Sequence, residues 1–223
     1  MSENGRHGTT QPDAAPVSAH RKTPRPAPAG SVRIIGGRWR GTRLPVPDRP
    51  GLRPTADRVR ETLFNWLQPV LPGARVLDLF AGSGALGLEA VSRGAAHAQL
   101  VEADAGLAQA LHAAAVRLEG GGAVAVHRGD ALEWMRGHAG GPFDIGFLDP
   151  PFAGGLWDAA VALLPGVMAR EAWLYVESPV DQAPSLPAEW AIHRENRTRD
   201  VRYALYRRGT LGPINGSGGS QTT

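Results

Sequence analysis

Two short segments of this 223-residue chain combine residue types that could hold a small ligand and act on it. The first runs from Asp78 to Gly87, where Gly82, Gly84 and Gly87 follow an apolar stretch in the spacing Gly-x-Gly-x-x-Gly. Glycines at this spacing allow a tight turn between a strand and a helix, in which a ligand can lie against bare backbone. The pattern fits a nicotinamide dinucleotide as well as other nucleosides, and also a turn that binds nothing, so the neighbouring residues must decide.

Acidic residues at three predicted strand ends favour a cationic nucleoside as the ligand. Asp78 precedes the glycine turn, where a carboxylate would repel the pyrophosphate of a dinucleotide but attract the ammonium and sulfonium of S-adenosylmethionine. Glu102 ends the next predicted strand and could accept hydrogen bonds from ribose hydroxyls. Asp130 follows the third strand, where it could accept from the adenine amino group or cap the next helix. The sequence therefore predicts S-adenosylmethionine as cofactor and no metal, with these binding residues: Asp78, Gly82, Gly84, Glu102 and Asp130.

The segment Asp149-Pro150-Pro151-Phe152 supplies candidate catalytic residues. Consecutive prolines donate no hydrogen bonds and hold the backbone extended, so the Asp149 carboxylate and the Pro150 carbonyl become fixed acceptors. Phe152 adds an aromatic face on which a base could stack. Together they could hold the amino group of a nucleobase. A carboxylate suits guanine, which presents two adjacent donors, better than adenine, which presents a donor beside an acceptor.

The elements that position these residues alternate between strand and helix. Strands are expected at 76–80, 98–102, 123–127, 144–149 and 172–177, and helices at 85–93, 105–118, 131–137 and 156–168. This alternation predicts an α/β fold with a mostly parallel sheet and helices on both faces. Two more strands, 190–194 and 201–207, would form a terminal antiparallel hairpin and complete seven strands. Ligands of such sheets bind at the carboxyl ends of the strands.

The segment before this alternation is short and basic. Strand-like pieces at 32–35 and 42–46, separated by glycines, predict a small β-hairpin, and a helix is expected to begin near Thr55. We therefore divide the chain into a basic hairpin extension at 31–52 and a catalytic domain at 53–208. The ends, 1–30 and 209–223, are rich in small and polar residues and are predicted to be disordered.

Composition and charge narrow the class of protein. Apolar residues make up 42% of the chain, enough for a core, and no apolar stretch approaches the ~20 residues of a membrane-spanning helix. There is no cysteine, which excludes disulfides and cysteine-ligated metals. The first thirty residues lack the apolar centre of a secretory signal, so we expect a cytoplasmic protein.

The charge is distributed unevenly along the chain, although the net charge is only +3. Residues 31–61 carry eight arginines against three acids, whereas residues 62–180 carry six arginines against twelve acids. A concentrated basic segment indicates a polyanionic partner, although a merely solvated face is the alternative. Trp39 could stack on a base or pack against the hairpin. The arginines expected to bind the phosphates of such a partner are Arg33, Arg38, Arg40, Arg43, Arg53, Arg58 and Arg60.

Several of these segments resemble a known family. The glycine turn, Glu102 and Asp149-Pro150-Pro151-Phe152 are similar to the class I S-adenosylmethionine-dependent methyltransferases that act on exocyclic amines. The segments 33–37, 53–61 and 77–87 resemble more closely the RsmD family of bacterial 16S rRNA guanine-N2 methyltransferases, over about residues 32–208. The chain differs from that family in a longer N-terminal tail and in a C-terminal hairpin that matches loosely around 203–206.

The resemblance implies a Rossmann-like methyltransferase fold and transfer of a methyl group to N2 of a guanine in 16S rRNA. The substrate would be the RNA of a small ribosomal subunit or an assembly intermediate, with its phosphates bound by the seven arginines named above, and the enzyme would be a monomer.

Three other functions fit parts of the sequence. A NAD-dependent oxidoreductase would use the same glycine turn. A non-catalytic RNA-binding or assembly factor could keep the cofactor pocket. An amino-methyltransferase acting on another RNA or on DNA, at adenine N6 or cytosine N4, would share the Asp149 motif, although no large recognition insert follows Phe152.

Overall fold

The computed structural model describes Met1 and residues 30–46, 56–152 and 155–209. The two predicted tails, apart from Met1, Gly30 and Gly209, and the predicted helix start at Thr55 lie outside these residues. The helices are α1 (Asp57–Leu67), α2 (Ala85–Ser92), α3 (Ala105–Arg117), α4 (Ala131–Gly137) and α5 (Trp157–Val167), with a short 3-10 turn η1 (Gly121–Ala123). The strands are β1 (Gly30–Arg33), β2 (Arg43–Val46), β3 (Arg75–Asp78), β4 (His97–Glu102), β5 (Val124–Arg128), β6 (Phe143–Leu148), β7 (Met168–Pro179), β8 (Trp190–Arg197) and β9 (Val201–Arg208).

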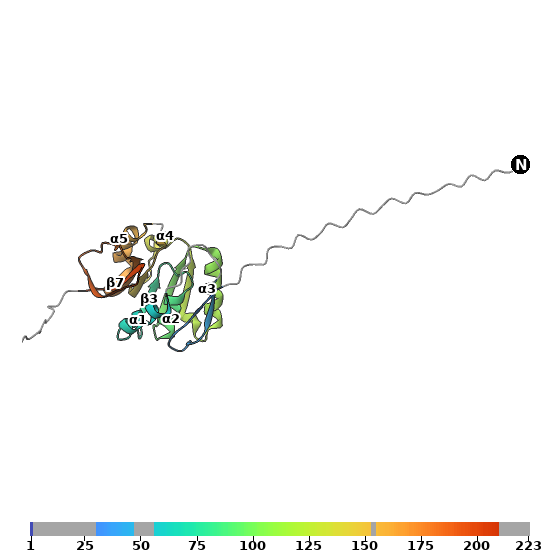
Figure 1. Cartoon of the computed structure of the whole chain (residues 1–223), viewed down its shortest axis with the longest axis horizontal. Coiled ribbons are helices and arrows are strands. Elements are labelled where there is room, and N and C mark those ends of the chain that lie inside the picture. The colour runs from blue at the N-terminus through green and yellow to red at the C-terminus, as the bar shows by residue number, and fades with distance from the viewer. Residues whose placement is uncertain (2–29, 47–55, 153–154, 210–223) are drawn as a thin grey trace, which may run out of the picture.

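A seven-stranded sheet forms the centre of the molecule (Figure 1), in the order β5-β4-β3-β6-β7-β9-β8. The first five strands in this order, β5, β4, β3, β6 and β7, run parallel to one another. Strand β9 pairs antiparallel with β7, and β8 pairs antiparallel with β9. The order reverses between β3 and β6, and this reversal creates the crevice at which α/β sheets bind ligands. The predicted Rossmann-like α/β fold, with seven strands and a terminal antiparallel pair, is confirmed.

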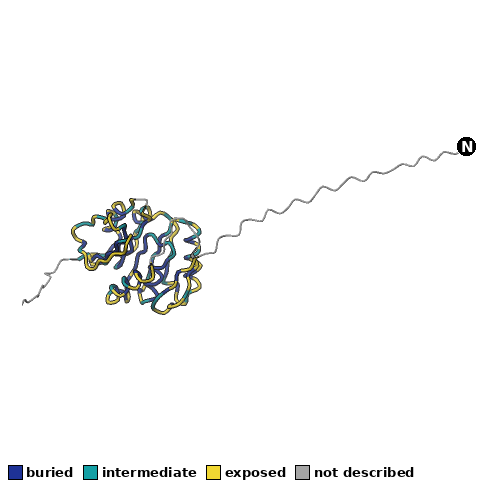
Figure 2. The backbone as a smooth tube through the Cα atoms, viewed as in Figure 1, coloured by how far each residue is buried: buried dark blue, intermediate teal, exposed yellow. Residues whose placement is uncertain are grey.

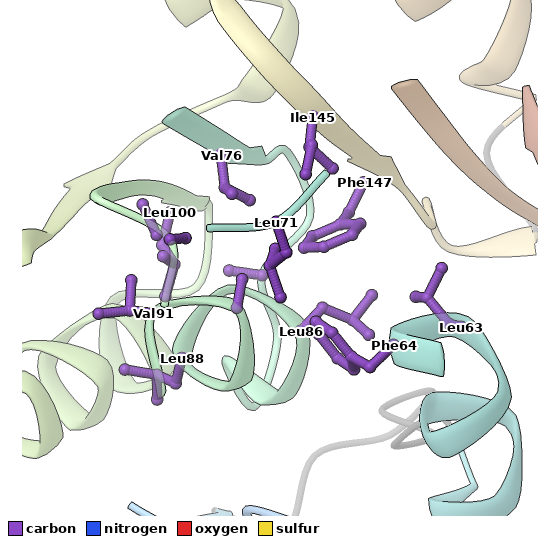
Figure 3. Packing of buried hydrophobic residues seen from close by; sticks show 14 of the residues in the cluster. Leu63, Phe64, Leu71, Val76, Leu86, Leu88, Val91, Leu100, Ile145 and Phe147 are labelled. Atoms are coloured by element: carbon purple, nitrogen blue, oxygen red, sulfur yellow. The ribbon is translucent and has the colours of Figure 1, made fainter. Parts of the chain in front are cut away.

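Side chains that alternate along the strands fill a separate apolar core on each face of the sheet. Val76 packs with α1, α2 and α3 on one face, whereas its neighbour Leu77 packs with α4 and α5 on the other. The central strands are accordingly the most buried part of the tube in Figure 2. Figure 3 shows the first core, where Phe64 of α1 and Leu86 of α2 point toward Val76 and Phe147 of the sheet.

The predicted N-terminal hairpin is present and packs on the body of the protein. β1 and β2 pair antiparallel from Gly30 opposite Val46 to Arg33 opposite Arg43. Its apolar residues Ile34 and Leu44 belong to the same core as α1, α2 and α3. The hairpin lies beside α3 (Figure 1), and its orientation relative to the sheet is fixed by this shared core.

Element boundaries differ from the predicted ones by a few residues. β7 begins at Met168, directly after α5, because the last helical turn, which contains Pro165, passes straight into the strand. α1 begins at Asp57, and the preceding Ala56 makes no side-chain cap. In the described part of the chain, no helix has the length and apolar character needed to cross a membrane.

Candidate active site

The glycine turn joins β3 to α2 in the conformation its sequence predicts. Gly82 and Gly84 have φ angles of +53° and +73°, in the left-handed region that side chains disfavour. Gly87 is required for a different reason, because a Cβ there would lie 2.6 Å from Leu100 Cδ1 on β4. Gly84 is itself buried, so the part of the turn open to a ligand is formed by Gly82 and Ser83.

Asp78 lies directly beneath this turn. Its side chain is 3% exposed, and its Oδ2 accepts a hydrogen bond of 2.9 Å from the Gly87 N–H. Burial raises the pKa of Asp78 to about 7, against the Gly87 hydrogen bond, which lowers it, and with a further increase from Glu102. A buried carboxylate that is costly to ionise is stabilised by a cation placed beside it.

Glu102 at the end of β4 is in direct contact with the turn. Its Oε2 accepts from the Gly82 N–H at 2.8 Å, and its Oε1 accepts from the Asp104 N–H at 2.7 Å. The structure thus brings together Asp78, Glu102 and the glycine turn, as the sequence predicts. Both carboxylate oxygens keep a free lone-pair direction, so hydrogen bonds to backbone do not prevent Glu102 from accepting another donor.

Asp130 caps α4. Its Oδ1 accepts from the Glu133 N–H at 2.9 Å, and the residue is exposed at the carboxyl end of β5. This is one of the two roles that the sequence left open. Its position after the third strand, on the same sheet edge as Glu102, leaves adenine binding as a proposal.

Three acidic side chains meet at the carboxyl ends of β3, β6 and β7. Asp78 pairs with Phe147 across β3 and β6, and Leu148 pairs with Val176 across β6 and β7, which places Asp149 next to Glu177. Val76 and Tyr175 pack in the core on the α2 side, so Asp78 and Glu177, two residues further along, point to that same face. Burial, then Glu177, then Asp78 raise the pKa of Asp149 well above its usual range.

Aromatic groups surround these carboxylates. The Tyr175 hydroxyl donates to Glu177 Oε2 at 2.9 Å, and burial together with the nearby acids raises the pKa of Tyr175 above its usual range. The Trp157 Nε1–H donates to the Glu177 backbone carbonyl at 3.1 Å. Phe152 lies 5.9 Å from Trp157, ring centroid to centroid, and is 39% exposed. Phe152 is therefore an accessible aromatic face next to the carboxylate cluster.

Of the seven arginines expected to bind RNA, Arg33, Arg38, Arg40, Arg43 and Arg58 are exposed, and Arg53 lies outside the described residues. Arg60 is different, because its side chain is fully buried. Its Nη1 donates to Glu89 Oε2 at 3.0 Å, and its Nη2 donates to the Arg33 carbonyl at 2.8 Å. The expectation that Arg60 grips RNA phosphates is wrong for this structure, because the guanidinium is enclosed and bound to a carboxylate of α2.

Glu89 is the centre of this buried network. It also accepts from the backbone N–H groups of Ile35 and Gly36 at 3.2 and 3.1 Å, and from Arg93 Nη2 at 2.7 Å. The turn of the hairpin is thus bound to the helix that begins at the glycine turn.

Trp39 packs rather than being free to stack on a base. It is 5% exposed, and its Nε1–H donates to the Glu119 carbonyl at 2.9 Å. The Trp39 N–H donates to Ser92 Oγ at 2.9 Å, so the hairpin is held by both α2 and the end of α3. Of the two roles considered for this residue, the structure shows the packing one.

Sequence reasoning missed Glu177 as a member of the site, although the sequence carried a signal for it. Glu177 ends the fifth predicted strand in the same way that Glu102 ends the second. Parallel strands bring such residues to one edge. Glu89 carried no comparable signal, because an acid inside a helix is usually exposed to solvent.

Comparison with known proteins identifies the family. Residues 32–207 match the family model described as Conserved hypothetical protein 95. The chain is 50% identical to the ribosomal RNA small subunit methyltransferase D of Escherichia coli, over 86% of this chain and 97% of that protein. It is 41% identical to the protein of the same name from Haemophilus influenzae, over 83% and 98%. The chain belongs to the ribosomal RNA small subunit methyltransferase D family.

A solved structure agrees with this assignment to methyltransferase D. The Escherichia coli methyltransferase yhhF matches with a TM-score of 0.73 and 50% identity, covering 81% of this chain and 99% of that one. The resemblance stated from the sequence is confirmed, and its span of about 32–208 agrees with the matched residues 32–207.

Proposed function

We propose that this protein transfers a methyl group from S-adenosylmethionine to the exocyclic N2 amino group of a guanine in 16S rRNA. The observation that carries the proposal is the position of Asp149. It comes directly after β6, the strand that pairs with β3, and the glycine turn comes after β3, so the two lie at the switch point of the sheet. Membership of the methyltransferase D family supports small-subunit ribosomal RNA as the substrate.

The residues around the glycine turn fit the proposed cofactor. S-adenosylmethionine supplies a methyl group made reactive by a positively charged sulfur. A pKa of about 7 means that ionisation of Asp78 costs free energy unless a cation lies nearby. Asp78 therefore favours the ammonium and sulfonium of this cofactor over a pyrophosphate. The Glu102 carboxylate, 2.8 Å from the Gly82 nitrogen, would accept from the ribose hydroxyls, and Asp130 from the adenine amino group.

The proposed reaction is a direct displacement in which the guanine N2 forms a bond to the methyl carbon while the carbon–sulfur bond breaks. Asp149 and the Pro150 carbonyl would accept the two N2 hydrogens and offset the positive charge that develops on nitrogen. The surplus proton would pass to Asp149. In its ionised form, a carboxylate with a raised pKa is a stronger base than an ordinary aspartate.

The rest of the site would position the base. Phe152, accessible beside Trp157, would stack on a guanine that has left its neighbours. The RNA phosphates would be bound by Arg53 and by five exposed arginines: Arg33, Arg38, Arg40, Arg43 and Arg58. The substrate would be 16S rRNA in a small subunit or an assembly intermediate, and the enzyme a cytoplasmic monomer.

The test is methylation of small-subunit rRNA by the purified full chain, read by mass spectrometry of the nucleosides. Asp149→Ala should lower kcat by about 10²–10⁴-fold, because it removes the main acceptor, and should leave cofactor affinity nearly unchanged. Asp158→Ala, an exposed acid on α5, is the matched control and should retain activity.

The products and a cofactor titration separate the other functions. Methyladenine or methylcytosine as product would contradict the guanine proposal while keeping the reaction class. Binding of NADH instead of S-adenosylmethionine would indicate an oxidoreductase. Full methylation of cellular rRNA by Asp149→Ala would contradict the assigned role of this residue.

A further inference from the structure

An open groove separates the N-terminal hairpin from the end of α3. Its volume is about 400 Å³, within the ~300–1,000 Å³ range typical of ligand sites. Arg38, Arg40 and Arg43 line it from the hairpin, and Arg117 lines it from the last turn of α3. We call these four residues and the space between them the arginine groove.

The walls of the arginine groove are held in place. Trp39 forms part of the wall, bound to the Glu119 carbonyl at 2.9 Å. The Arg38 guanidinium lies 4.7 Å from the Trp39 ring centroid and fits against Gly120, where a Cβ would come within 3.0 Å of Arg38 Nη1. A groove with fixed walls can bind without first becoming ordered, which lowers the entropy cost of binding.

The charge of the groove is strongly positive. Its lining contains four arginines and one acidic residue, Glu119, and no ion pair within the described residues joins Arg38, Arg40, Arg43 or Arg117 to a carboxylate. Within the described residues, the Arg43 side chain donates a hydrogen bond to the Ser31 hydroxyl, at 3.5 Å. Guanidinium groups that line one groove without such ion pairs can provide a binding site for phosphates.

The groove also leads toward the glycine turn. A smaller cavity, lined by Gly82 and Ser83 of that turn, shares Leu44, Pro45 and Ala114 with the arginine groove. The two cavities are therefore neighbours along the side of β2 and α3. A strand held in the groove would pass beside the glycine turn on its way to the reaction site.

We propose that the arginine groove binds backbone phosphates of the substrate RNA and that Arg117, on α3, completes the phosphate site begun by the hairpin. The proposal rests on the proposed function for the identity of the ligand. It separates the arginines that line the groove, which bind RNA, from the buried Arg60, which holds the hairpin. It also assigns an opposing effect to Glu119, because a carboxylate repels phosphate.

The test compares Arg117→Gln with Arg136→Gln, an exposed arginine of α4 and therefore a matched loss of one positive charge. The full chain binds a fluorescent fragment of small-subunit rRNA at several salt concentrations, and cofactor affinity is measured in parallel. We expect Arg117→Gln to weaken RNA binding about tenfold and to reduce the salt slope by about 0.7, with cofactor affinity unchanged. Arg136→Gln should behave as wild type.

A second variant tests the same groove in the opposite direction. Glu119→Gln should tighten RNA binding, and a gain in affinity cannot be the result of misfolding. The proposal is overturned if Arg117→Gln equals Arg136→Gln, or if Glu119→Gln fails to tighten binding. Methylation by the wild-type protein is scored separately, so loss of the proposed function with an intact Arg117 effect is distinguishable from failure of the groove.

Discussion

Asp78 combines two properties that rarely occur together in one residue. It is almost fully buried, and it lies where the glycine turn would place a positively charged ligand. Desolvation raises its pKa to about 7, so near neutral pH it is ionised in only part of the molecules. A cation bound beside it would lower the pKa again and drive release of the proton. Cofactor binding and proton release are therefore expected to be linked.

This linkage predicts a pH-dependent affinity for S-adenosylmethionine. The affinity should increase from pH 5.5 to pH 7.5, because the protonated carboxyl must lose its proton before it attracts the cation. Below pH 7, each increase of one pH unit should raise the affinity by up to about tenfold. Calorimetry in two buffers of different ionisation enthalpy would count the protons released. Asp78→Asn should bind the cofactor weakly and without this pH dependence. Equal proton release by Asp78→Asn and wild type would contradict the assignment.

The same shift has a consequence for the ligand-free protein. The pKa of Asp78 is higher in the folded state than the 3.8 of a free aspartate, so the folded state binds more protons between about pH 4 and pH 7. Stability should therefore fall as pH rises through this window, in contrast to the behaviour of an ion-paired carboxylate. The Asp78→Asn protein provides the comparison, since its thermal denaturation should show a smaller loss over the same range.

At the scale of elements, α2 connects the two halves of the proposed site. Its first turn is attached to Asp78 through the Gly87 N–H, and further along Glu89 binds the hairpin backbone and Arg60. The Glu89 and Arg60 side chains are both fully buried. A buried ion pair of this kind is a weak source of net stability, but removal of one partner leaves an uncompensated charge. The network is better understood as fixing the hairpin relative to the glycine turn.

We therefore predict that Glu89→Gln loosens the hairpin. An amide cannot accept the hydrogen bonds of Arg60 and Arg93 and those of two backbone N–H groups together, so the free energy of unfolding should fall by about 3–5 kcal/mol. Amide hydrogen exchange at Ile35 and Gly36 should accelerate, and RNA affinity should fall. Glu61→Gln, an exposed acid on α1, is the control and should change stability by about 0.5 kcal/mol or less. Unchanged exchange at Ile35 and Gly36 in Glu89→Gln would show that another contact holds the hairpin.

At the scale of the whole molecule, the order of the elements could be predicted from the sequence, whereas contacts between distant segments could not. The strand–helix order, the seven strands and the position of Asp78, Glu102 and Asp149 at strand ends follow from local patterns, because parallel strands bring these ends to one edge. Arg60 was misassigned because charge along a sequence does not reveal that a guanidinium meets a buried acid 29 residues later. The proposed role of Arg117 could not be predicted for a related reason, because its groove exists only after the hairpin packs on α3. The sequence therefore predicts the types of the elements, but not the contacts between segments that are distant in the chain.

The uneven charge of the whole molecule should also orient the protein as it approaches RNA. Residues 31–61 carry a net +5 and residues 62–180 a net −6, so the protein should approach RNA with its hairpin first. At about 0.1 M salt, charges act over only about 10 Å, which means that the position of an arginine should matter more than the net charge.

Arg40→Gln and Arg170→Gln test this, because each removes one positive charge from an exposed site, the first in the arginine groove and the second on β7, across the molecule from α3 (Figure 1). In stopped-flow binding to an rRNA fragment at low salt, Arg40→Gln should lower the association rate constant several-fold, whereas Arg170→Gln should leave it nearly unchanged. The difference should shrink as salt increases and screening removes the steering field. Equal effects of the two substitutions would mean that net charge, and not the placement of the basic hairpin, governs the encounter.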